Sequence, residues 1–263
     1  MPRYILLIVL LATICSSSAE VLIYGDTRSH PEIHRLLIAQ VKERDFDLVL
    51  HLGDLNQKGR KQAEYDEFLG IISPLKAEFF PIRGNHEKDL QLFLKNFPQI
   101  GAKSYYTICR DSIQYTILDS NLSLLPDSEQ YRWLQHELQQ SALPVILLLH
   151  HPVFSSGYHG QELNLQLYLP ELLRKYNVIA MISGHEHSFE HLCQEGLPYI
   201  VSGGGGAPLR GARSMSPYSK FFCQIHHYNI LQRKTDYIQF ESYDLKGNLI
   251  YEFQIPLTQG SDE

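Results

Sequence analysis

Five apolar runs in this chain each end on side chains that bind metal ions in proteins. The runs "VLIYGD", "LVLHLGD", "FFPIRGNH", "VILLLHH" and "IAMISGHEH" end on Asp26, on Asp54, on Asn85 with His86, on His150 with His151, and on His185 with His187. In open α/β sheets, ligands bind just beyond the carboxyl ends of the strands. If these runs are strands that end at one edge, they bring carboxylates, an amide and imidazoles together. That donor set suits divalent ions such as Mn, Fe or Zn.

The order of the apolar patterns predicts an α/β protein. Helical periodicity covers residues 31–43, 63–75, 90–97, 127–140 and 163–176, with Asp127 as the expected cap of the fourth helix. Strand-like runs cover residues 21–24, 48–52, 78–82, 104–109, 113–118, 144–149 and 178–183, and residues after 197 are mostly β-like, ending in 228–232, 237–243 and 249–255. This alternation followed by a β-rich part predicts two packed sheets with helices outside.

Composition narrows the class of partner. The chain has 263 residues, a net charge of −6 and no run of Lys or Arg. This balance argues against a nucleic-acid polymer or an anionic membrane surface as the partner. The sequence shows no repeat or linker, so we expect one domain over residues 20–258 and a frayed tail at 259–263.

The N-terminus predicts a signal peptide over residues 1–19. Arg3 precedes an apolar stretch at 4–14 that is too short to span a bilayer comfortably, and small residues follow up to Ala19. We therefore expect cleavage after Ala19 and a secreted or periplasmic protein without a membrane span. The alternatives are an uncleaved anchor and, less favoured, a lipid on Cys15.

Three cysteines follow the expected cleavage site: Cys109, Cys193 and Cys223. An odd number in an oxidising compartment allows one disulfide and one free thiol, or no disulfide. Their spacing matches no zinc-binding pattern.

The motifs at the strand ends share one physical logic. Glycine comes directly before Asp26 and Asp54, where it lets the backbone turn at a position in which a Cβ would crowd a metal ion. His185 and His187 are two residues apart, so they lie on one side of an extended segment. The run of four glycines at 203–206 lacks the Lys-Ser/Thr of a phosphate-binding loop and predicts a turn with close backbone approach.

Together these motifs resemble the calcineurin-like metallophosphoesterase superfamily, and within it the purple acid phosphatase branch. The superfamily pattern DxH, GDxxD, GNH, H and GHxH corresponds here to residues 26–28, 53–57, 84–87, 150 and 184–187. Further similarity lies in "QYRWLQHEL" and "HHPVFSSGYHG", and the likeness spans residues 21–255. The resemblance implies a four-layer α/β/β/α sandwich of two mixed sheets flanked by helices.

The resemblance also implies a site of two divalent metal ions. The implied ligands are Asp54 as a bridge, Asp26 and His187 on the first ion, and Asn85, His150 and His185 on the second. His150 is preferred to His151 because the family ligand lies two residues before a proline, here Pro152. His86 would be the general acid, and a metal-activated hydroxide would attack phosphorus without a phosphoenzyme.

Two positions depart from the family pattern. Arg28 replaces the histidine of DxH, and Gln57 replaces the tyrosine of the purple branch. Arginine stays protonated and cannot bind a metal ion, so the first site is expected to be weaker, and no iron–tyrosinate colour is expected. Arg28 either clamps a substrate phosphate or lies exposed beside the next helix. His151 and His159 are the other candidate substrate-binding residues.

These observations favour an exported phosphomonoesterase that acts on a small phosphorylated molecule, since the sequence shows no second large domain to enclose a nucleotide. One alternative is a phosphodiesterase or nucleotidase. The other is a degenerate, non-catalytic surface protein that retains the fold, and Arg28 is the feature that keeps this alternative open.

Overall fold

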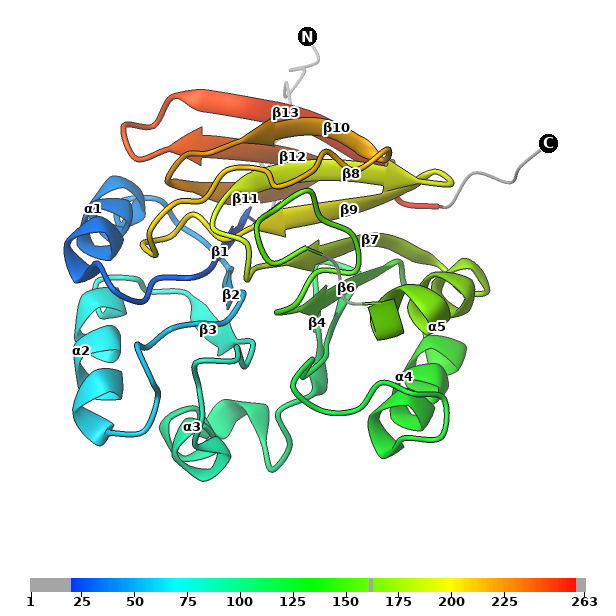
Figure 1. Ribbon diagram of the computed structural model, residues 1–263, viewed down its shortest axis with the longest axis horizontal. Coiled ribbons are helices and arrows are strands. Elements are labelled where there is room, and N and C mark those ends of the chain that lie inside the picture. The colour runs from blue at the N-terminus through cyan, green and yellow to red at the C-terminus, as the bar shows by residue number, and fades with distance from the viewer. Residues whose placement is uncertain (1–19, 161–162, 259–263) are drawn as a thin grey trace, which may run out of the picture.

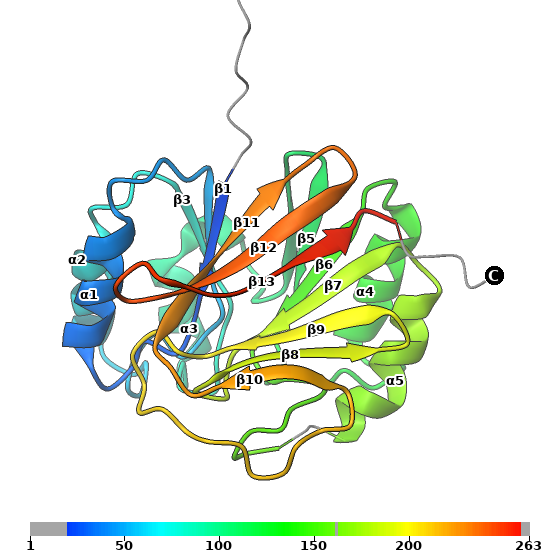
Figure 2. The ribbon, with the colours of Figure 1, turned by 90° about the horizontal axis from the view of Figure 1, so that it is seen from above.

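The structure is a computed structural model that describes residues 20–160 and 163–258 (Figure 1). The predicted signal peptide, Cys15 and the predicted tail lie outside the described residues. Two sheets pack together, and helices lie beside them on both sides of the molecule (Figure 2). The predicted two-sheet α/β/β/α architecture is therefore confirmed.

The first sheet has six strands in the order β13-β12-β11-β1-β2-β3. Their bounds are β1 Glu20–Tyr24, β2 Leu48–His51, β3 Glu78–Pro81, β11 His227–Arg233, β12 Tyr237–Asp244 and β13 Leu249–Pro256. The helices on its side are α1 Pro31–Val41, α2 Gln62–Ile72 and α3 Leu90–Asn96, followed by a short 3₁₀ turn, η1 Pro98–Ile100. β1, β2 and β3 are parallel, and β11 to β13 are antiparallel, so the sheet is mixed.

The second sheet has seven strands in the order β10-β8-β9-β7-β6-β5-β4. Their bounds are β4 Tyr106–Arg110, β5 Ile113–Ile117, β6 Val145–Leu149, β7 Val178–Ser183, β8 Phe189–Gln194, β9 Leu197–Ser202 and β10 Ser219–Cys223. Helices α4 (Glu129–Gln140) and α5 (Leu163–Arg174) lie on its side (Figure 2). Among the described helices, none is long and apolar enough to cross a membrane.

Strand β6 shows why this sequence forms a buried strand between two cores. All five of its residues are buried. Ile146 and Leu148 join the core between the sheets, whereas Val145, Leu147 and Leu149 join the core under α4 and α5. Successive side chains of a strand point to opposite faces, so an uninterrupted apolar run fills both cores.

The parallel registers bring the strand ends to the same level. Tyr24 pairs with His51 and His51 with Pro81 at the ends of β1, β2 and β3, and Leu149 pairs with Ser183 at the ends of β6 and β7. The loops that carry the candidate ligands follow directly after these ends. The topology thus gathers them from both sheets.

Three local expectations differ from the structure. The cap of α4 is Ser128, whose hydroxyl accepts the N–H of Tyr131 at 3.2 Å, and not Asp127, whose carbonyl instead accepts a hydrogen bond from Arg132. The sequence analysis missed β8 and assigned no bounds to β10, both of which pair at one side of the second sheet. The three described cysteines are unpaired, so the disulfide alternative is not realised.

We predict that the protein loses stability in mild acid. Burial lowers the pKa of His227 from 6.5 to about 4 and that of His34 to about 3. The unfolded chain therefore binds more protons below pH 6.5, and the free energy of unfolding should fall between about pH 6.5 and pH 4, by roughly 1–3 kcal/mol per imidazole. Urea unfolding at several pH values measures this.

Two variants separate the buried imidazoles from general acid effects. His227→Gln should reduce the loss, whereas His136→Gln, on the exposed face of α4, should leave it unchanged. An identical pH profile for wild type and His227→Gln would contradict the prediction.

Candidate metal centre

Three of the candidate ligands have a backbone conformation that residues other than glycine rarely adopt. Asp26, Asp54 and His185 have φ angles of 59°, 54° and 71°. Left-handed conformations cost on the order of 1 kcal/mol or more for such residues and cluster at functional sites. Gly53, with φ of 95°, supplies the turn directly before Asp54. The packed sheets hold these residues in a conformation that local propensity opposes.

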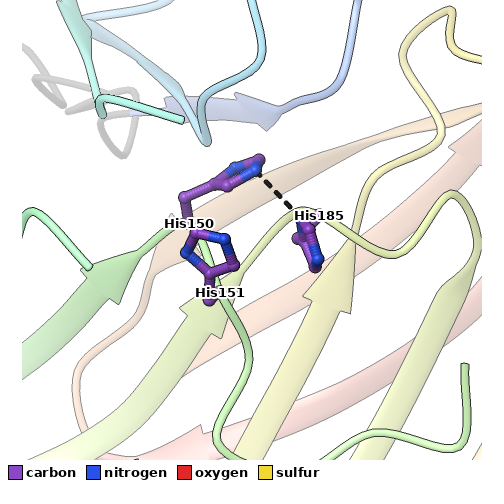
Figure 3. A group of neighbouring side chains, drawn as sticks. All are labelled: His150, His151 and His185. Carbon is purple, nitrogen blue, oxygen red and sulfur yellow. Dashed lines mark hydrogen bonds between the residues drawn. The ribbon is translucent and has the colours of Figure 1, made fainter. Parts of the chain in front are cut away.

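Asn85, His150 and His185 converge after β3, β6 and β7. Asn85 Oδ1 lies 3.1 Å from both His150 Nε2 and His185 Nδ1, and the two nitrogens are 3.3 Å apart. Figure 3 shows the rings of His150 and His185 turned toward each other, with His151 beside them. Asp54 Oδ1 lies 3.3 Å from His150 Nε2. Four donor atoms therefore surround the expected position of the second ion.

A carbonyl group from a segment far away in the sequence determines which ring nitrogen of His150 carries the proton. Its Nδ1 lies 2.8 Å from the carbonyl oxygen of Leu52, which can only accept, so Nδ1 carries the hydrogen. Nε2 then presents a lone pair to the group formed with Asn85 and His185. Burial lowers the pKa of His150 well below its ordinary value, which keeps the ring neutral, as a metal ligand must be. The chemistry of this position fits a divalent cation.

The donors expected for the first ion are also close together, but Arg28 lies among them. Asp26 Oδ1 is 3.7 Å from His187 Nε2 and is buried without a hydrogen-bond partner among the described residues. Arg28 donates from Nε to Asp54 Oδ2 at 3.2 Å and from Nη2 to His187 Nε2 at 3.3 Å. These residues therefore do not fit a cation at the first position in the way that they fit one at the second.

The two carboxylates expected to bind metal in this centre are fully buried. Asp26 and Asp54 are 0 % and 1 % exposed. Burial, followed by the nearby charge of Asp54, raises the pKa of Asp26 well above its ordinary value. Backbone N–H groups offset part of this cost, because His185 donates to Asp26 Oδ2 and His86 donates to Asp54 Oδ1, both at 2.9 Å. Such a pair requires positive charge nearby.

His86 lies at the mouth of the centre. Its Nδ1 donates to the carbonyl oxygen of Gln57 at 2.6 Å, and its Nε2 is 3.8 Å from Asp54 Oδ2. The side chain is 24 % exposed, so a substrate can reach it. Nε2 carries a proton to donate only when the ring is an imidazolium.

The predicted substrate-binding histidines lie on the rim. The rings of His151 and His159 are each 4.4 Å from the ring of His185, measured between centroids. Arg210 contacts His159 and lies over the ring of Tyr158. Arg28 does not lie on this rim, because its guanidinium points inward to Asp54 and His187.

Glu87 organises the centre, a role that the sequence analysis did not assign. It is fully buried, and its carboxylate accepts the N–H groups of Asp54 and Gly84, both at 3.0 Å, and of Asn56 at 3.1 Å. One side chain therefore ties the loop after β2 to the loop after β3. The "GNHE" motif was the available signal, because a buried acid after a strand end needs several donors.

The glycines at 203–206 form the expected turn with close backbone approach. A Cβ on Gly203 would lie 2.2 Å from the carbonyl oxygen of Glu186 and 2.8 Å from Asp26 Oδ2. A Cβ on Gly205 would lie 2.4 Å from the carbonyl oxygen of Gly25. Lack of space, rather than a positive φ, requires glycine here.

The comparisons with known proteins agree with this geometry. The family model for calcineurin-like phosphoesterases matches residues 19–189, more than half of the chain, so the chain belongs to this family. It is 26 % identical to purple acid phosphatase 21 of Arabidopsis thaliana over 225 residues, which cover 69 % of this chain and 50 % of that protein. It is also 26 % identical to the human tartrate-resistant acid phosphatase type 5 over 221 residues, which cover 69 % and 68 %.

A third relative and a solved structure extend the comparison. The chain is 30 % identical to a cAMP/cGMP dual specificity phosphodiesterase of Mycobacterium tuberculosis over 170 residues, covering 59 % of this chain and 53 % of that one. A purple acid phosphatase from yellow lupin (Lupinus luteus) seeds has the same fold, with a TM-score of 0.74 and 20 % identity over 92 % of this chain and 54 % of that one. The chain spans about half the length of several of the curated relatives that it matches.

We predict that Glu87→Gln destabilises the protein. Both carboxylate oxygens accept backbone N–H groups, so an amide would turn its own NH₂ toward one of them. The expected loss is about 1–3 kcal/mol in the free energy of unfolding, measured by urea denaturation. Glu43→Gln, at a side chain that is 88 % exposed, is the matched control and should change stability by less than about 0.5 kcal/mol. Equal effects of the two substitutions would contradict this role.

Proposed function

We propose that this protein is a metal-dependent hydrolase of phosphate esters, and that its preferred substrates are small phosphomonoesters. The observation that carries the proposal is the convergence of Asn85, His150, His185 and Asp54 on one position, in a chain of the phosphoesterase family. The relatives named as acid phosphatases favour a monoester. The net charge of −6 argues against a nucleic-acid polymer as substrate.

In the proposed mechanism, the side chains of the centre hold and orient the reacting groups. A bound divalent cation would polarise the phosphoryl oxygen and supply an activated water. His151 and His159, whose rings each lie 4.4 Å from the ring of His185, would contact the phosphate from the rim. The carbonyl group of Gln57 orients His86 so that Nε2 of the imidazolium can protonate the leaving oxygen. We also propose export directed by residues 1–19, which N-terminal sequencing of the natural protein tests.

A panel of phosphate esters tests the proposed function. The purified protein, loaded with Mn²⁺ or Zn²⁺, should hydrolyse para-nitrophenyl phosphate with a higher kcat/KM than bis(para-nitrophenyl) phosphate. The opposite preference would identify a phosphodiesterase, the second candidate, which the similarity to the mycobacterial phosphodiesterase favours. Protein with bound metal and no hydrolysis of either ester would contradict both and identify a non-catalytic protein.

A ligand variant and its control belong in the same panel. His185→Ala removes a ligand from the best-formed ion position and should lower kcat by at least about 100-fold while the chain stays folded. His136→Ala, on the exposed face of α4, should retain full activity. Unchanged turnover in His185→Ala would exclude this centre as the active site.

We predict that His86→Ala slows the hydrolysis of esters with poor leaving groups most. An alkyl phosphate needs a proton on its leaving oxygen, whereas para-nitrophenolate leaves without one. The expected loss is about 10²–10⁴-fold for alkyl phosphates and much smaller for para-nitrophenyl phosphate, measured as kcat. Equal losses for both substrates would show that His86 is not the general acid.

A further inference from the structure

The guanidinium group of Arg28 lies where the first cation of a two-metal centre would be bound. It donates to Asp54 Oδ2 at 3.2 Å and to His187 Nε2 at 3.3 Å, and these are two of the atoms expected to hold that cation. The Arg28 side chain is only 11 % exposed, and the side chains of Asp54 and His187 are 2 % and 1 % exposed. Arg28 is thus part of the buried centre.

The proton arrangement shows that a cation and Arg28 compete for the same lone pair. His187 Nδ1 lies 2.7 Å from the carbonyl oxygen of Pro208, so Nδ1 carries the hydrogen and Nε2 presents a lone pair. Arginine can only donate hydrogen bonds, so the contact between Nη2 and Nε2 uses that lone pair. A single lone pair cannot bind a hydrogen and a metal ion together.

Arg28 thus occupies two of the atoms expected to bind the first ion. A third such atom, Asp26 Oδ1, has no hydrogen-bond partner within the described part of the chain. Ligand atoms of Asp54 and His150 also lie within 4.8 Å of an Asp26 carboxylate oxygen, but they belong to the second position. One remaining carboxylate oxygen is a poor site for a transition-metal ion, because protein sites for such ions use three or more ligands.

The second position keeps its four donor atoms. Arg28 contacts Oδ2 of Asp54, whereas the Asp54 atom beside His150 is Oδ1. The hydrogen bonds of the centre link Asn85, His150 and His185 to one another and not to Arg28.

A short chain of hydrogen bonds holds Arg28 in place. Its Nη1 donates to Ser29 Oγ at 3.3 Å, and the Ser29 hydroxyl donates to Gln57 Oε1 at 2.8 Å. The backbone N–H of Arg28 donates to the carbonyl oxygen of Asp54 at 3.2 Å. The two positions that depart from the family pattern, 28 and 57, are therefore joined through Ser29. They form one arrangement rather than two independent losses.

We infer that this centre binds a single metal ion, at Asn85, His150, His185 and Asp54, and that the Arg28 guanidinium is a permanent second cation. Arg28 compensates the buried charge of Asp54. Because it is part of the chain, it cannot dissociate into solvent as a bound metal ion can. Its contacts use three of five N–H groups, which leaves two (5 − 3) to donate to a phosphoryl oxygen. This use of Arg28 deepens the proposed function and depends on it, whereas the ion count does not.

The stoichiometry of bound Mn²⁺ tests the inference. After equilibrium dialysis against excess Mn²⁺, elemental analysis should find one ion per wild-type chain and two ions per Arg28→His chain, because histidine restores a ligand. Electron paramagnetic resonance should show the hyperfine pattern of an isolated Mn²⁺ ion in the wild type and of an exchange-coupled pair in Arg28→His. Arg35→His, at an exposed arginine of α1, is the matched control and should bind one ion.

Arg28→Ala is a second variant that keeps the test valid if Arg28→His does not fold. It clears the first position while Asp26, Asp54 and His187 remain, so it should bind more than one ion at high Mn²⁺ with an unchanged far-UV circular dichroism spectrum. Two ions in the wild type would overturn the inference, as would one ion in both folded Arg28 variants.

The test also separates the inference from the proposed function. A wild-type chain with two ions and phosphatase activity would overturn the inference alone. A wild-type chain with one ion and no hydrolysis of either ester would overturn the proposed function and leave the ion count standing. A chain that binds no ion would overturn both.

Discussion

Two carboxylates buried side by side govern the rest of this centre. Asp26 and Asp54 are withdrawn from water, and an uncompensated pair of buried charges would cost several kcal/mol per ion. Hydrogen bonds donated to the two carboxylates offset this cost. The donors are the backbone N–H groups of His185 and His86 and the guanidinium of Arg28. Nearby, the donor atoms of Asn85, His150 and His185 converge on one position suited to a cation. The balance between buried carboxylates and positively charged or hydrogen-bond-donating groups at the strand ends thus connects the fold to metal binding in the centre.

The two apolar cores make this arrangement possible. Left-handed conformations at Asp26, Asp54 and His185 are unfavourable, and each of these residues follows shortly after a strand whose last four residues are buried. Glu87 links two of the loops, and the glycines at 203–206 allow a third segment to approach within contact distance of Gly25 and Asp26. The stability of the cores therefore supports a strained and charged site that the loops alone would not maintain.

Prediction from sequence succeeded where a pattern is local. Asp26, Asp54 and His150 follow mainly apolar runs that form the strands β1, β2 and β6, as predicted. The residues of β6 alternate between the two cores, as expected for a buried strand. Prediction failed where tertiary contacts decide. β8 was missed because its sequence, "FEHLCQ", is polar at half of its positions, and it is a strand because it pairs with both β9 and β10. The cap of α4 was misplaced by one residue because Asp127 and Ser128 are both good caps, and the local backbone conformation favours Ser128.

The sequence by itself determined which residues stand at the ends of the strands, and hence the family and the set of candidate donors. Only the tertiary structure decided what each donor faces. The lone pair of His150 points to Asn85 because the carbonyl group of Leu52, 98 residues away, fixes the proton on the other nitrogen. Arg28 could have lain exposed beside the next helix, yet its guanidinium is buried and contacts His187, 159 residues away. Hydrogen bonds between distant segments set these directions, and spacing along the chain does not encode them.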